Sequence, residues 1–308
     1  MTGGWRKEGL VYKCDIFGTD YAQIPFIDPV SDTVWRIYYS TRTRDVVSYP
    51  FSLDVAAGDP KNILKVHDRP LLELGERGAF DDSGLTVSSI VNVGGRKYLY
   101  YIGWNQRVSV SYALNIGLAV SEDGGSTFKK MFRGPVVDRS RFDPIFATAP
   151  CVVREEGLFR MWYVSCLRWD VIDDRTEPVY IIKHAVSPDG MDWEINDKIC
   201  LDSAYEGEAL GRPWVVREGG VYKMWFSARG SRGYRLGEGQ HYMLAYAESA
   251  DGLNWERRPD KFSLPLSPEG WDSEMMEYCS VHVHSGKKYM LYNGNSFGRT
   301  GFGLAVEE

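Results

Sequence analysis

Carboxylates recur at five places along this chain of 308 residues, roughly sixty residues apart, each just before an apolar stretch typical of a strand. They are Asp20; Asp81 and Asp82; Asp143; Glu206 and Glu208; and Asp272, Glu274 and Glu277. Carboxylates that share a site raise one another's pKa, which leaves a proton donor beside an ionised base. If the five places converge, the chemistry they favour is acid–base catalysis. The plainer alternative is that Asp is common in turns that lead into strands.

The elements that would bring these residues together follow the same spacing. Aromatic runs stand at 34–40 (VWRIYYS), 97–103 (KYLYYIG), 158–164 (LFRMWYV), 221–227 (VYKMWFS) and 288–294 (KYMLYNG). The apolar residue at the centre of each is Ile37, Leu99, Met161, Met224 and Met290, at intervals of 62, 62, 63 and 66 residues. Each run follows a turn and another apolar stretch, and a third strand-like stretch comes after it. The pattern predicts a repeated unit of antiparallel strands.

A Ser-x-Asp-Gly turn closes three of these units, in SEDGGSTF (121–128), SPDGMDW (187–193) and SADGLNW (249–255). Asp side chains bond to nearby backbone groups in such turns, and Gly adopts the positive φ that they require. We therefore interpret the turn as the hairpin between the third and fourth strands, an architectural feature and not a catalytic one.

Five units that cannot bury themselves alone predict an all-β fold, a five-bladed β-propeller with four-stranded antiparallel blades. The chain would form a single domain, 1–308, because cutting a closed ring exposes sheet edges. The expected blades are 20–80, 81–142, 143–205, 206–270 and 271–308. The last unit stops before a fourth strand, so we expect residues 8–17 to supply it and close the ring.

The first strand of each propeller blade lines the central channel, so the carboxylates that precede these strands are the candidate catalytic residues. Among them the main candidates are Asp20, Asp82, Asp143, Glu208 and Glu277. Arg42 and Arg212 are candidates to hold a carboxylate or phosphate of a substrate, although Arg212 alternatively pairs with a neighbouring acid. The other candidate substrate contacts are Gln23, Trp104, Asp272, Glu274, Tyr278 and Tyr292.

The repeat and its acidic positions resemble the five-bladed propeller clan of glycoside hydrolases, with families 43, 32 and 68. Segments such as GAFDDSGLTVSS, GRPWVV and GWDSEMMEY are more closely similar to a bacterial group found with polysaccharide and nucleotide-sugar genes. The clan's pattern implies a base or nucleophile Asp on the first blade, matched by Asp20, and a supporting Asp on the second, matched by Asp82. The third blade offers Asp143 and no Glu, which moves the acid to Glu208 or Glu277.

The resemblance implies a carbohydrate-active enzyme, glycoside hydrolase-like, acting at the anomeric centre of a sugar, oligosaccharide or nucleotide sugar in polysaccharide metabolism. Glycosyl transfer and phosphorolysis on the same scaffold stay open because of the missing third-blade Glu. The rival from another class is a non-catalytic propeller that binds a glycan or serves as a scaffold. That rival predicts that Asp20, Asp82, Glu208 and Glu277 do not converge.

The composition disfavours several classes of binding partner. A net charge of −6 disfavours a nucleic-acid polymer, and no apolar run reaches the length of a membrane-spanning helix. Five scattered cysteines without paired spacing favour a reducing cytoplasm. His282 and His284 share a strand face but lack a third ligand at fixed spacing, so we expect no bound metal. The sequence has no Gly-rich loop of the phosphate-binding kind, so we also expect no cofactor.

Overall fold

The computed structural model describes residues 4–16, 21–43, 45–235 and 239–307. Its strands form three four-stranded antiparallel sheets and one eight-stranded sheet. The larger sheet consists of two antiparallel runs, β2 to β5 and β6 to β9, joined by one parallel pair of residues, Ser48 and Gly84. The prediction of an all-β chain made of four-stranded antiparallel units is confirmed; the junction between the first two was not foreseen.

We number the antiparallel runs one to five in chain order. The first holds β2 (Gln23–Pro29), β3 (Val34–Arg42), β4 (Ser48–Ala56) and β5 (Asp59–Val66). The second holds β6 (Gly84–Val93), β7 (Arg96–Gln106), β8 (Tyr112–Ser121) and β9 (Lys129–Lys130). The third holds β10 (Phe146–Glu155), β11 (Leu158–Ile172), β12 (Arg175–Ser187) and β13 (Glu194–Leu201).

The fourth run holds β14 (Ala209–Glu218), β15 (Val221–Arg229), β16 (Met243–Ser249) and β17 (Glu256–Arg257). The fifth holds β18 (Glu277–His284), β19 (Lys287–Asn293), β20 (Phe302–Glu307) and β1 (Trp5–Tyr12). A single turn, α1 (Asn295–Gly298), connects β19 to β20. No helix in the described ranges has the length and apolar character needed to cross a membrane.

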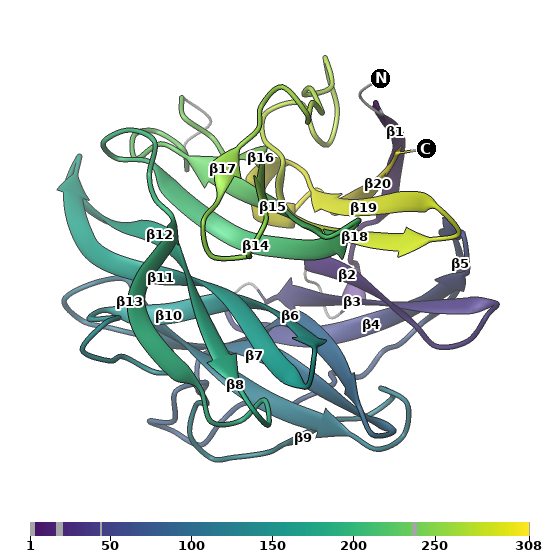
Figure 1. Ribbon diagram of the computed structural model, residues 1–308, viewed down its shortest axis with the longest axis horizontal. Helices are drawn as coiled ribbons and strands as arrows, with labels where there is room; N and C mark the ends of the chain where they lie inside the picture. The colour runs from purple at the N-terminus through teal and green to yellow at the C-terminus, as the bar shows by residue number, and fades with distance from the viewer. Residues whose placement is uncertain (1–3, 17–20, 44, 236–238, 308) are drawn as a thin grey trace.

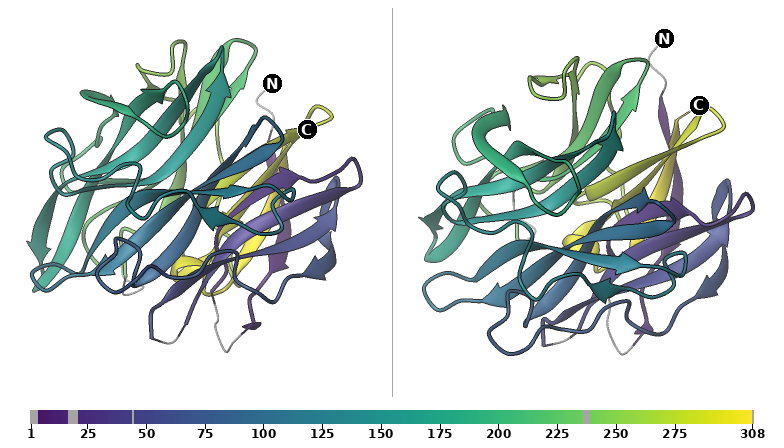
Figure 2. Two further views of the ribbon diagram at one scale, coloured as in Figure 1. Left: turned by 90° about the horizontal axis from the view of Figure 1, so that it is seen from below. Right: turned by 60° about the horizontal axis from the view of Figure 1, so that its bottom comes forward.

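The N-terminal strand β1 is the fourth strand of the fifth run; it spans Trp5–Tyr12, whereas the sequence placed this strand at residues 8–17. β1 pairs antiparallel with β20, with Trp5 opposite Glu307 and Tyr12 opposite Phe302. The two ends of the chain therefore lie side by side (Figure 1). The sheets follow one another in chain order around a common centre in all three views (Figures 1 and 2).

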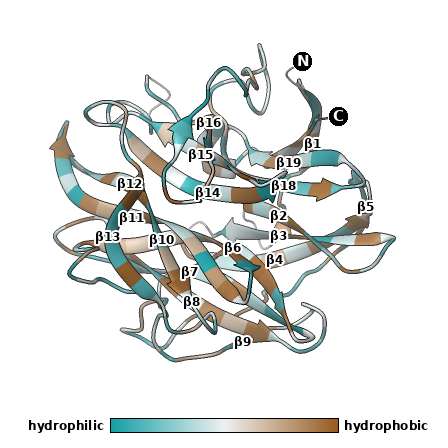
Figure 3. Cartoon of the chain, in the orientation of Figure 1, coloured by the Kyte–Doolittle hydropathy of each residue, from teal (hydrophilic) through white to brown (hydrophobic). Residues whose placement is uncertain are grey.

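The first strands of the runs meet at this centre. β2 contacts β6, β6 contacts β10, β10 contacts β14, β14 contacts β18, and β18 contacts β2. Each run is short and two-sided, so its apolar face is buried against the next run. The five central residues of the aromatic repeat, Ile37, Leu99, Met161, Met224 and Met290, are all 0% exposed. Hydrophobic positions accordingly recur along the strands, while the loops are more hydrophilic (Figure 3).

The Ser-x-Asp-Gly turns join successive runs, which explains why they recur. The Tyr38 hydroxyl donates to the Gly125 carbonyl at 3.1 Å, Tyr100 to Gly190 at 2.7 Å, and the Trp162 indole N–H to Gly252 at 2.7 Å. In each pair the aromatic belongs to one run and the glycine to the next.

Only glycine suits these turn positions, for two reasons. Gly125, Gly190 and Gly252 have positive φ values of 90°, 79° and 75°. A Cβ at Gly125 would also lie 2.1 Å from the Tyr38 hydroxyl oxygen. The prediction that the turns are architectural is confirmed, and each turn also docks the neighbouring sheet.

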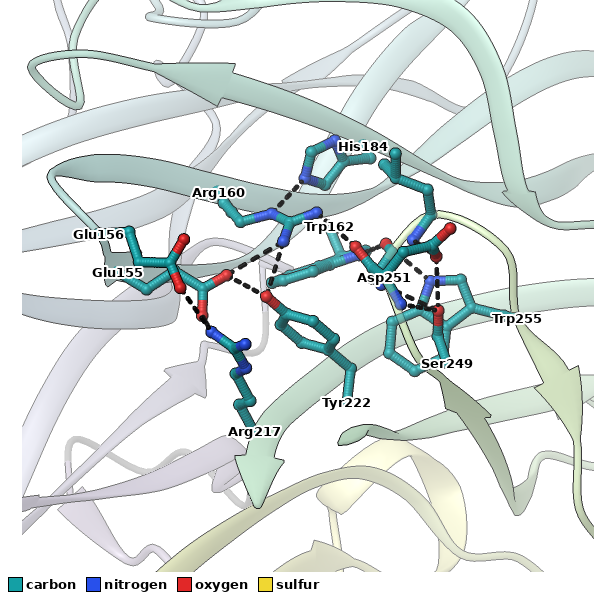
Figure 4. A network of polar contacts seen from close by, with 12 residues as sticks. Glu155, Glu156, Arg160, Trp162, His184, Arg217, Tyr222, Ser249, Asp251 and Trp255 are labelled. Atoms are coloured by element: carbon teal, nitrogen blue, oxygen red, sulfur yellow. Dashed lines mark hydrogen bonds and ion pairs between the residues drawn. The ribbon is translucent and has the colours of Figure 1, made fainter. Parts of the chain in front are cut away.

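A polar network reinforces the contact between the third and fourth runs (Figure 4). The Arg160 guanidinium donates to the Tyr222 hydroxyl at 2.7 Å and to the Asp251 carbonyl at 2.8 Å, and it pairs with Glu155 at 3.1 Å. Burial, together with the positive charge of Arg160, lowers the pKa of His184 to about 4. His184 is therefore neutral at neutral pH and acts here as a structural residue.

Candidate active site

A pocket of about 190 Å³ opens where the first strands meet. Every run contributes to its lining: Ile24 from β2, Thr86 from β6, Ala149 from β10, Gly211 from β14 and Tyr278 from β18. We call it the axial pocket. Its central position matches the expectation that residues from distant parts of the sequence converge at the leading ends of the first strands.

The first strands are irregular beside this pocket. The pairing register shifts between Gln23 and Phe26, Val87 and Ser89, Thr148 and Cys151, Gly211 and Trp214, and Glu277 and Ser280. Within four of these bulges a residue other than glycine has positive φ: Ile24 at 54°, Ala149 at 48°, Arg212 at 35° and Tyr278 at 51°. All four line the pocket. Such bulges redirect side chains, and backbone strain of this kind is common at functional sites.

Aromatic and aliphatic side chains make up most of the pocket wall. Trp104, Tyr112, Tyr180, Tyr234, Tyr242 and Phe297 join Tyr278 in the lining. The hydroxyl groups of Tyr112 and Tyr180 lie 2.8 Å apart, close enough to hydrogen bond. Gln23 also lines the pocket, where its side-chain amide donates to the Phe297 carbonyl at 2.5 Å. Flat rings with polar edges are suited to bind a sugar, whose faces are apolar and whose rim carries hydroxyls.

Four arginines give the pocket its charge: Arg42, Arg212, Arg229 and Arg235. Arg212 is 2% exposed, and its guanidinium donates to the carbonyls of Tyr278 at 3.0 Å and Ser88 at 3.1 Å. It thereby links the second, fourth and fifth runs. Burial lowers the pKa of Arg212 to about 10, which still leaves it positive at neutral pH.

Arg229 is equally buried and held in one orientation. It donates to the Tyr242 hydroxyl at 3.2 Å, the Gly230 carbonyl at 3.0 Å and the Pro178 carbonyl at 3.1 Å. Its guanidinium carbon lies 3.8 Å from the centre of the Tyr234 ring, a cation–π contact. Arg235, in contrast, pairs with Glu177 at 3.1 Å at the exposed edge of the pocket.

Glu277 is a buried carboxyl group beside this pocket, adjacent in sequence to the lining residue Tyr278. It is 0% exposed, and neither carboxyl oxygen has a hydrogen-bond partner with regular geometry among the described residues. Burial raises its pKa well above the usual value, although Tyr278 and the positive charges of Arg229, Arg235 and Arg42 act in the opposite direction. Burial is the larger effect, because no described residue forms a direct ion pair with Glu277, and the carboxyl group is then protonated at neutral pH.

The structure gives most of the other predicted acids a different environment. We call Asp81, Asp143, Glu208 and Asp272 the leading carboxylates, because each precedes the first strand of its run. Three accept a hydrogen bond from the tyrosine of their own aromatic run: Asp81 from Tyr101 at 3.0 Å, Asp143 from Tyr163 at 3.1 Å, and Asp272 from Tyr292 at 2.9 Å.

Each leading carboxylate also faces a cation from an outer strand of the same run. Asp81 pairs with Lys130 at 2.6 Å, Asp143 with Lys183 at 3.6 Å, Glu208 with Arg257 at 2.7 Å, and Asp272 with Lys7 at 2.6 Å. All four acids are at most 3% exposed, and none lines the axial pocket. Their recurrence in the sequence therefore has a structural explanation, a buried ion pair repeated from run to run.

Some of the remaining predicted residues line the axial pocket and others do not. Arg42, Gln23, Trp104, Arg212 and Tyr278 line the pocket, whereas Tyr292 and Glu274 do not. Asp82 is held in its turn by the Gly78 N–H at 2.8 Å, the Ser83 hydroxyl at 2.7 Å and the Asn105 amide at 2.6 Å. Although partial burial opposes it, these hydrogen bonds lower the pKa of Asp82, so this carboxylate is ionised. Asp20 lies outside the described residues.

Sequence reasoning missed Arg229, Arg235, Tyr234 and Tyr242. They lie at the end of β15 and in the loop before β16, in the segment ARGSRGYRLGEGQHY (228–242). Its three closely spaced arginines before position 236 were a usable signal.

The described residues contain no group of three or more His, Cys, Asp or Glu side chains arranged to hold a metal ion. His282 and His284 instead pack edge-to-face against Trp35, with ring centres 4.8 and 5.1 Å from the centre of the indole. Burial lowers the pKa of His282 to about 4. The pair is part of the packing between the first and fifth runs.

The fold is similar to that of solved glycoside hydrolases. One structure, described as a "Glycoside hydrolase", aligns with a TM-score of 0.71 at 17% identity, covering 98% of this chain and 90% of that one. A "thermostable family-43 glycoside hydrolase" aligns with a TM-score of 0.66 at 14% identity, covering 96% and 91%. A structure described as "The GH130 family of mannoside phosphorylases contains glycoside hydrolases that target beta-1,2 mannosidic linkages in Candida mannan" aligns at 0.68 and 13%, covering 99% and 94%. At these identities the likeness defines a class of fold, the propeller type of the glycoside hydrolases.

Sequence relationship identifies the family more narrowly. The chain is 38% identical over 309 residues to "Uncharacterized protein Rv1502" of Mycobacterium tuberculosis (strain ATCC 25618 / H37Rv), covering 99% of both chains. The identity to "Uncharacterized protein MT1551" of strain CDC 1551 / Oshkosh is also 38%, with the same coverage. The chain belongs to the family of these mycobacterial proteins. No protein-family model matches it.

Proposed function

We propose that this protein is a sugar-acting enzyme of the glycosidase kind whose active site is the axial pocket. The observation that carries the proposal is Glu277, a fully buried carboxyl group without a regular hydrogen bond to any described residue, beside a pocket lined by tyrosines and arginines. Buried polar groups are normally satisfied, and the exceptions are concentrated at functional sites. The fold shared with glycoside hydrolases supports this interpretation.

The proposal includes a five-bladed propeller that forms one domain. The eight-stranded sheet would count as two blades, because a single residue pair joins its halves. The closed contacts among β2, β6, β10, β14 and β18 support this count. Cys151, Cys166, Cys200 and Cys279 are buried thiols that form no disulfide with a described residue, which supports the reducing cytoplasm that the sequence suggested. Fractionation of cells that express the protein tests that location.

In this proposal Glu277 is the general acid and Asp20 the base or nucleophile. The bond between the anomeric carbon and the leaving oxygen breaks, and that oxygen takes the Glu277 proton. In the hydrolytic version, water attacks the anomeric carbon and gives its proton to Asp20. Asp20 directly precedes the segment that supplies Gln23 and Ile24 to the pocket lining. Gln23, Trp104, Tyr278, Arg42 and Arg212 would contact the substrate.

This catalytic set does not include three of the predicted catalytic residues, Asp82, Asp143 and Glu208. The substrate contacts do not include Asp272, Glu274 and Tyr292. Asp143, Glu208 and Asp272 each have an ion-pair partner. Asp82 is ionised and held by hydrogen bonds within its loop. None of the six residues lines the axial pocket. These same ion pairs favour the second candidate function, a non-catalytic glycan-binding propeller, because they leave fewer acids at the centre.

The test is the Glu277→Gln variant, which keeps the shape of the side chain and removes the proton. We expect kcat to fall by a factor of about 10² to 10⁴, measured on the best substrate from a screen of short oligosaccharides and nucleotide sugars. Glu76→Gln, an exposed carboxylate in a surface pair with Arg133, is the matched control. Product formation that requires added phosphate or an acceptor sugar would identify phosphorolysis or transfer.

Full turnover by Glu277→Gln would end its assignment as the acid. If the unmodified protein binds glycans but turns over no substrate of the screen, the non-catalytic candidate is supported instead.

A further inference from the structure

The described residues do not balance the charge of the axial pocket. Four lining residues are arginines, and no Asp or Glu in the described part of the chain lines the pocket. Among the described carboxyl groups near it, Glu177 pairs with Arg235, and Glu277 is buried in a way that favours its protonated form. The pocket therefore carries an excess of positive charge inside a protein whose net charge is −6.

The one buried arginine of the described ranges that lies outside the pocket has an acidic partner. Three arginines of the described ranges are below 9% exposed: Arg36, Arg212 and Arg229. Arg36 pairs with Asp54 at 2.7 Å. Arg212 and Arg229 both line the axial pocket, and neither has an ion pair with any described residue. Removing a guanidinium from water without a counter-charge is unfavourable unless something else compensates for it.

The donors that remain free are at the same place. Arg229 uses three of its five N–H groups for the Tyr242 hydroxyl and the Gly230 and Pro178 carbonyls. The Nε groups of Arg42 and Arg212 are buried and have no hydrogen-bond partner among the described residues. The Arg212 backbone has a φ of 35°, so the chain adopts a strained conformation at the residue that carries one of these donors.

These groups suit an oxyanion. Guanidinium groups form charge-assisted, often paired hydrogen bonds with carboxylates and phosphates, and arginines fixed by other contacts lose little entropy on binding. The tyrosines and Trp104 of the wall would contact the uncharged part of the same ligand. A neutral sugar would bring no counter-charge to the buried guanidinium groups, which also lack one among the described residues.

We propose that the substrate of this pocket is an anionic sugar, whose carboxylate or phosphate is bound by Arg42, Arg212 and Arg229. This inference deepens the proposed function and rests on the axial pocket being the sugar site. It does not depend on which residue transfers the proton. The two sources of the charge, a uronate and a phosphate ester, share the recognition chemistry and are separated by the experiment.

The experiment is isothermal titration calorimetry with ligands that differ in charge: glucuronate against glucose, galacturonate against galactose, and glucose 1-phosphate and inorganic phosphate. We expect at least one charged sugar to bind about 10- to 100-fold more tightly than its neutral counterpart, as charge-assisted hydrogen bonds imply. Its affinity should also decrease as NaCl is raised. A preference for the uronates identifies a carboxylate, and a preference for glucose 1-phosphate identifies a phosphate.

Arg42→Gln is the first variant, because Arg42 is half-buried and packs against the face of the Tyr21 ring, with its guanidinium carbon 5.7 Å from the ring centre. Its loss should therefore perturb the fold little. It should remove the preference for the charged ligand and leave the affinity for the neutral one within about twofold. Arg229→Lys, which keeps the charge but not the fork of donors, should lower the affinity for the anion less. Arg133→Gln, in the exposed pair with Glu76, is the matched control and should change neither affinity.

Equal binding of charged and neutral sugars, no saturable binding of any anion in the millimolar range, or an unchanged preference in Arg42→Gln would each overturn the inference. Tight binding of inorganic phosphate with no preference between charged and neutral sugars would also overturn it, since the anion is then a co-substrate. Binding is measured as well in Glu277→Gln. An anion preference that persists there while turnover proves independent of Glu277 supports the inference and refutes the proposed acid.

Discussion

The leading carboxylates and the axial pocket are built from the same repeat but have opposite electrostatics. Asp143 receives hydrogen bonds from Tyr163 and Ser165 at 3.1 and 2.6 Å and faces Lys183. Glu277 is just as buried, yet it has neither an ion pair nor a regular hydrogen bond with a described residue. A buried acid with a complete set of partners stabilises the fold, whereas one without them is available for chemistry. Partners, and not position in the repeat, separate the two roles.

Asp143→Asn should give the largest loss of stability. It would leave Lys183, whose side chain is 1% exposed, without its buried counter-charge. Breaking a buried pair from one side typically costs about 3 kcal/mol or more. Guanidinium unfolding followed by circular dichroism measures the free energy of unfolding. A loss below about 1 kcal/mol would mean that Asp143 is not structural, and the contrast with Glu277 would fail.

The stability of Glu277→Gln relative to the unmodified protein should depend on pH. The pKa of Glu277 is higher in the folded protein than in the unfolded chain. At pH values between these two pKa values, the folded protein keeps the Glu277 proton and the unfolded chain releases it. Stability contributed at this site is therefore full at acidic pH and decreases as pH rises.

The amide of the variant does not titrate. The free energy of unfolding of the variant, relative to that of the unmodified protein, should therefore rise by at most about 1.4 kcal/mol per pH unit above about pH 4.5. Unfolding of both proteins at several pH values from 4 to 8 checks this prediction. A constant difference across that range would contradict the raised pKa.

Two tyrosine-to-phenylalanine variants compare the leading carboxylates with the axial pocket through smaller expected effects. Tyr292→Phe removes the hydroxyl that donates to Asp272 at 2.9 Å, and we expect a loss of about 1 kcal/mol in the free energy of unfolding. Tyr278→Phe removes a pocket hydroxyl whose partner Glu277 has no ion pair among the described residues, so the loss of stability should be smaller than in Tyr292→Phe, while sugar affinity falls. Similar stability losses in both variants would show that the two hydroxyls have the same role.

The smallest effect is expected at the surface. Arg133→Gln breaks a pair with Glu76 in which the two side chains are 90% and 81% exposed. Solvent screens such a pair, so stability should change by less than about 0.5 kcal/mol. A larger change would undermine the assumption that burial determines the energies compared above.

The architecture of single runs could be predicted from the sequence because its signals are local. Alternating aromatic positions around Ile37, Leu99 and Met161 mark strands, and Ser-x-Asp-Gly marks the hairpins. The environment of the acids could not be predicted in the same way. The Lys183 that faces Asp143 lies two strands away, and the Lys7 that faces Asp272 lies near the other end of the chain.

The pocket was predictable in location but not in charge. Arg42 and Arg212 were recognised as candidates, whereas Arg229 lies at the end of a strand where its orientation depends on Pro178 and Tyr242. The bulges that direct Ile24 and Ala149 towards the axis occur at residues other than glycine. No local sequence signal therefore marks them.

The pairing of β1 with β20 has a consequence for folding. Runs one to four are each contiguous in sequence, so each sheet can form from neighbouring hairpins. The fifth requires Trp5 to meet Glu307, a contact that must wait until nearly the whole chain is ordered. Loop closure over that distance is slow, and we expect the last sheet to assemble in a separate, late kinetic phase. A tag or fusion attached ahead of Trp5 would delay that phase more than one placed in a surface hairpin.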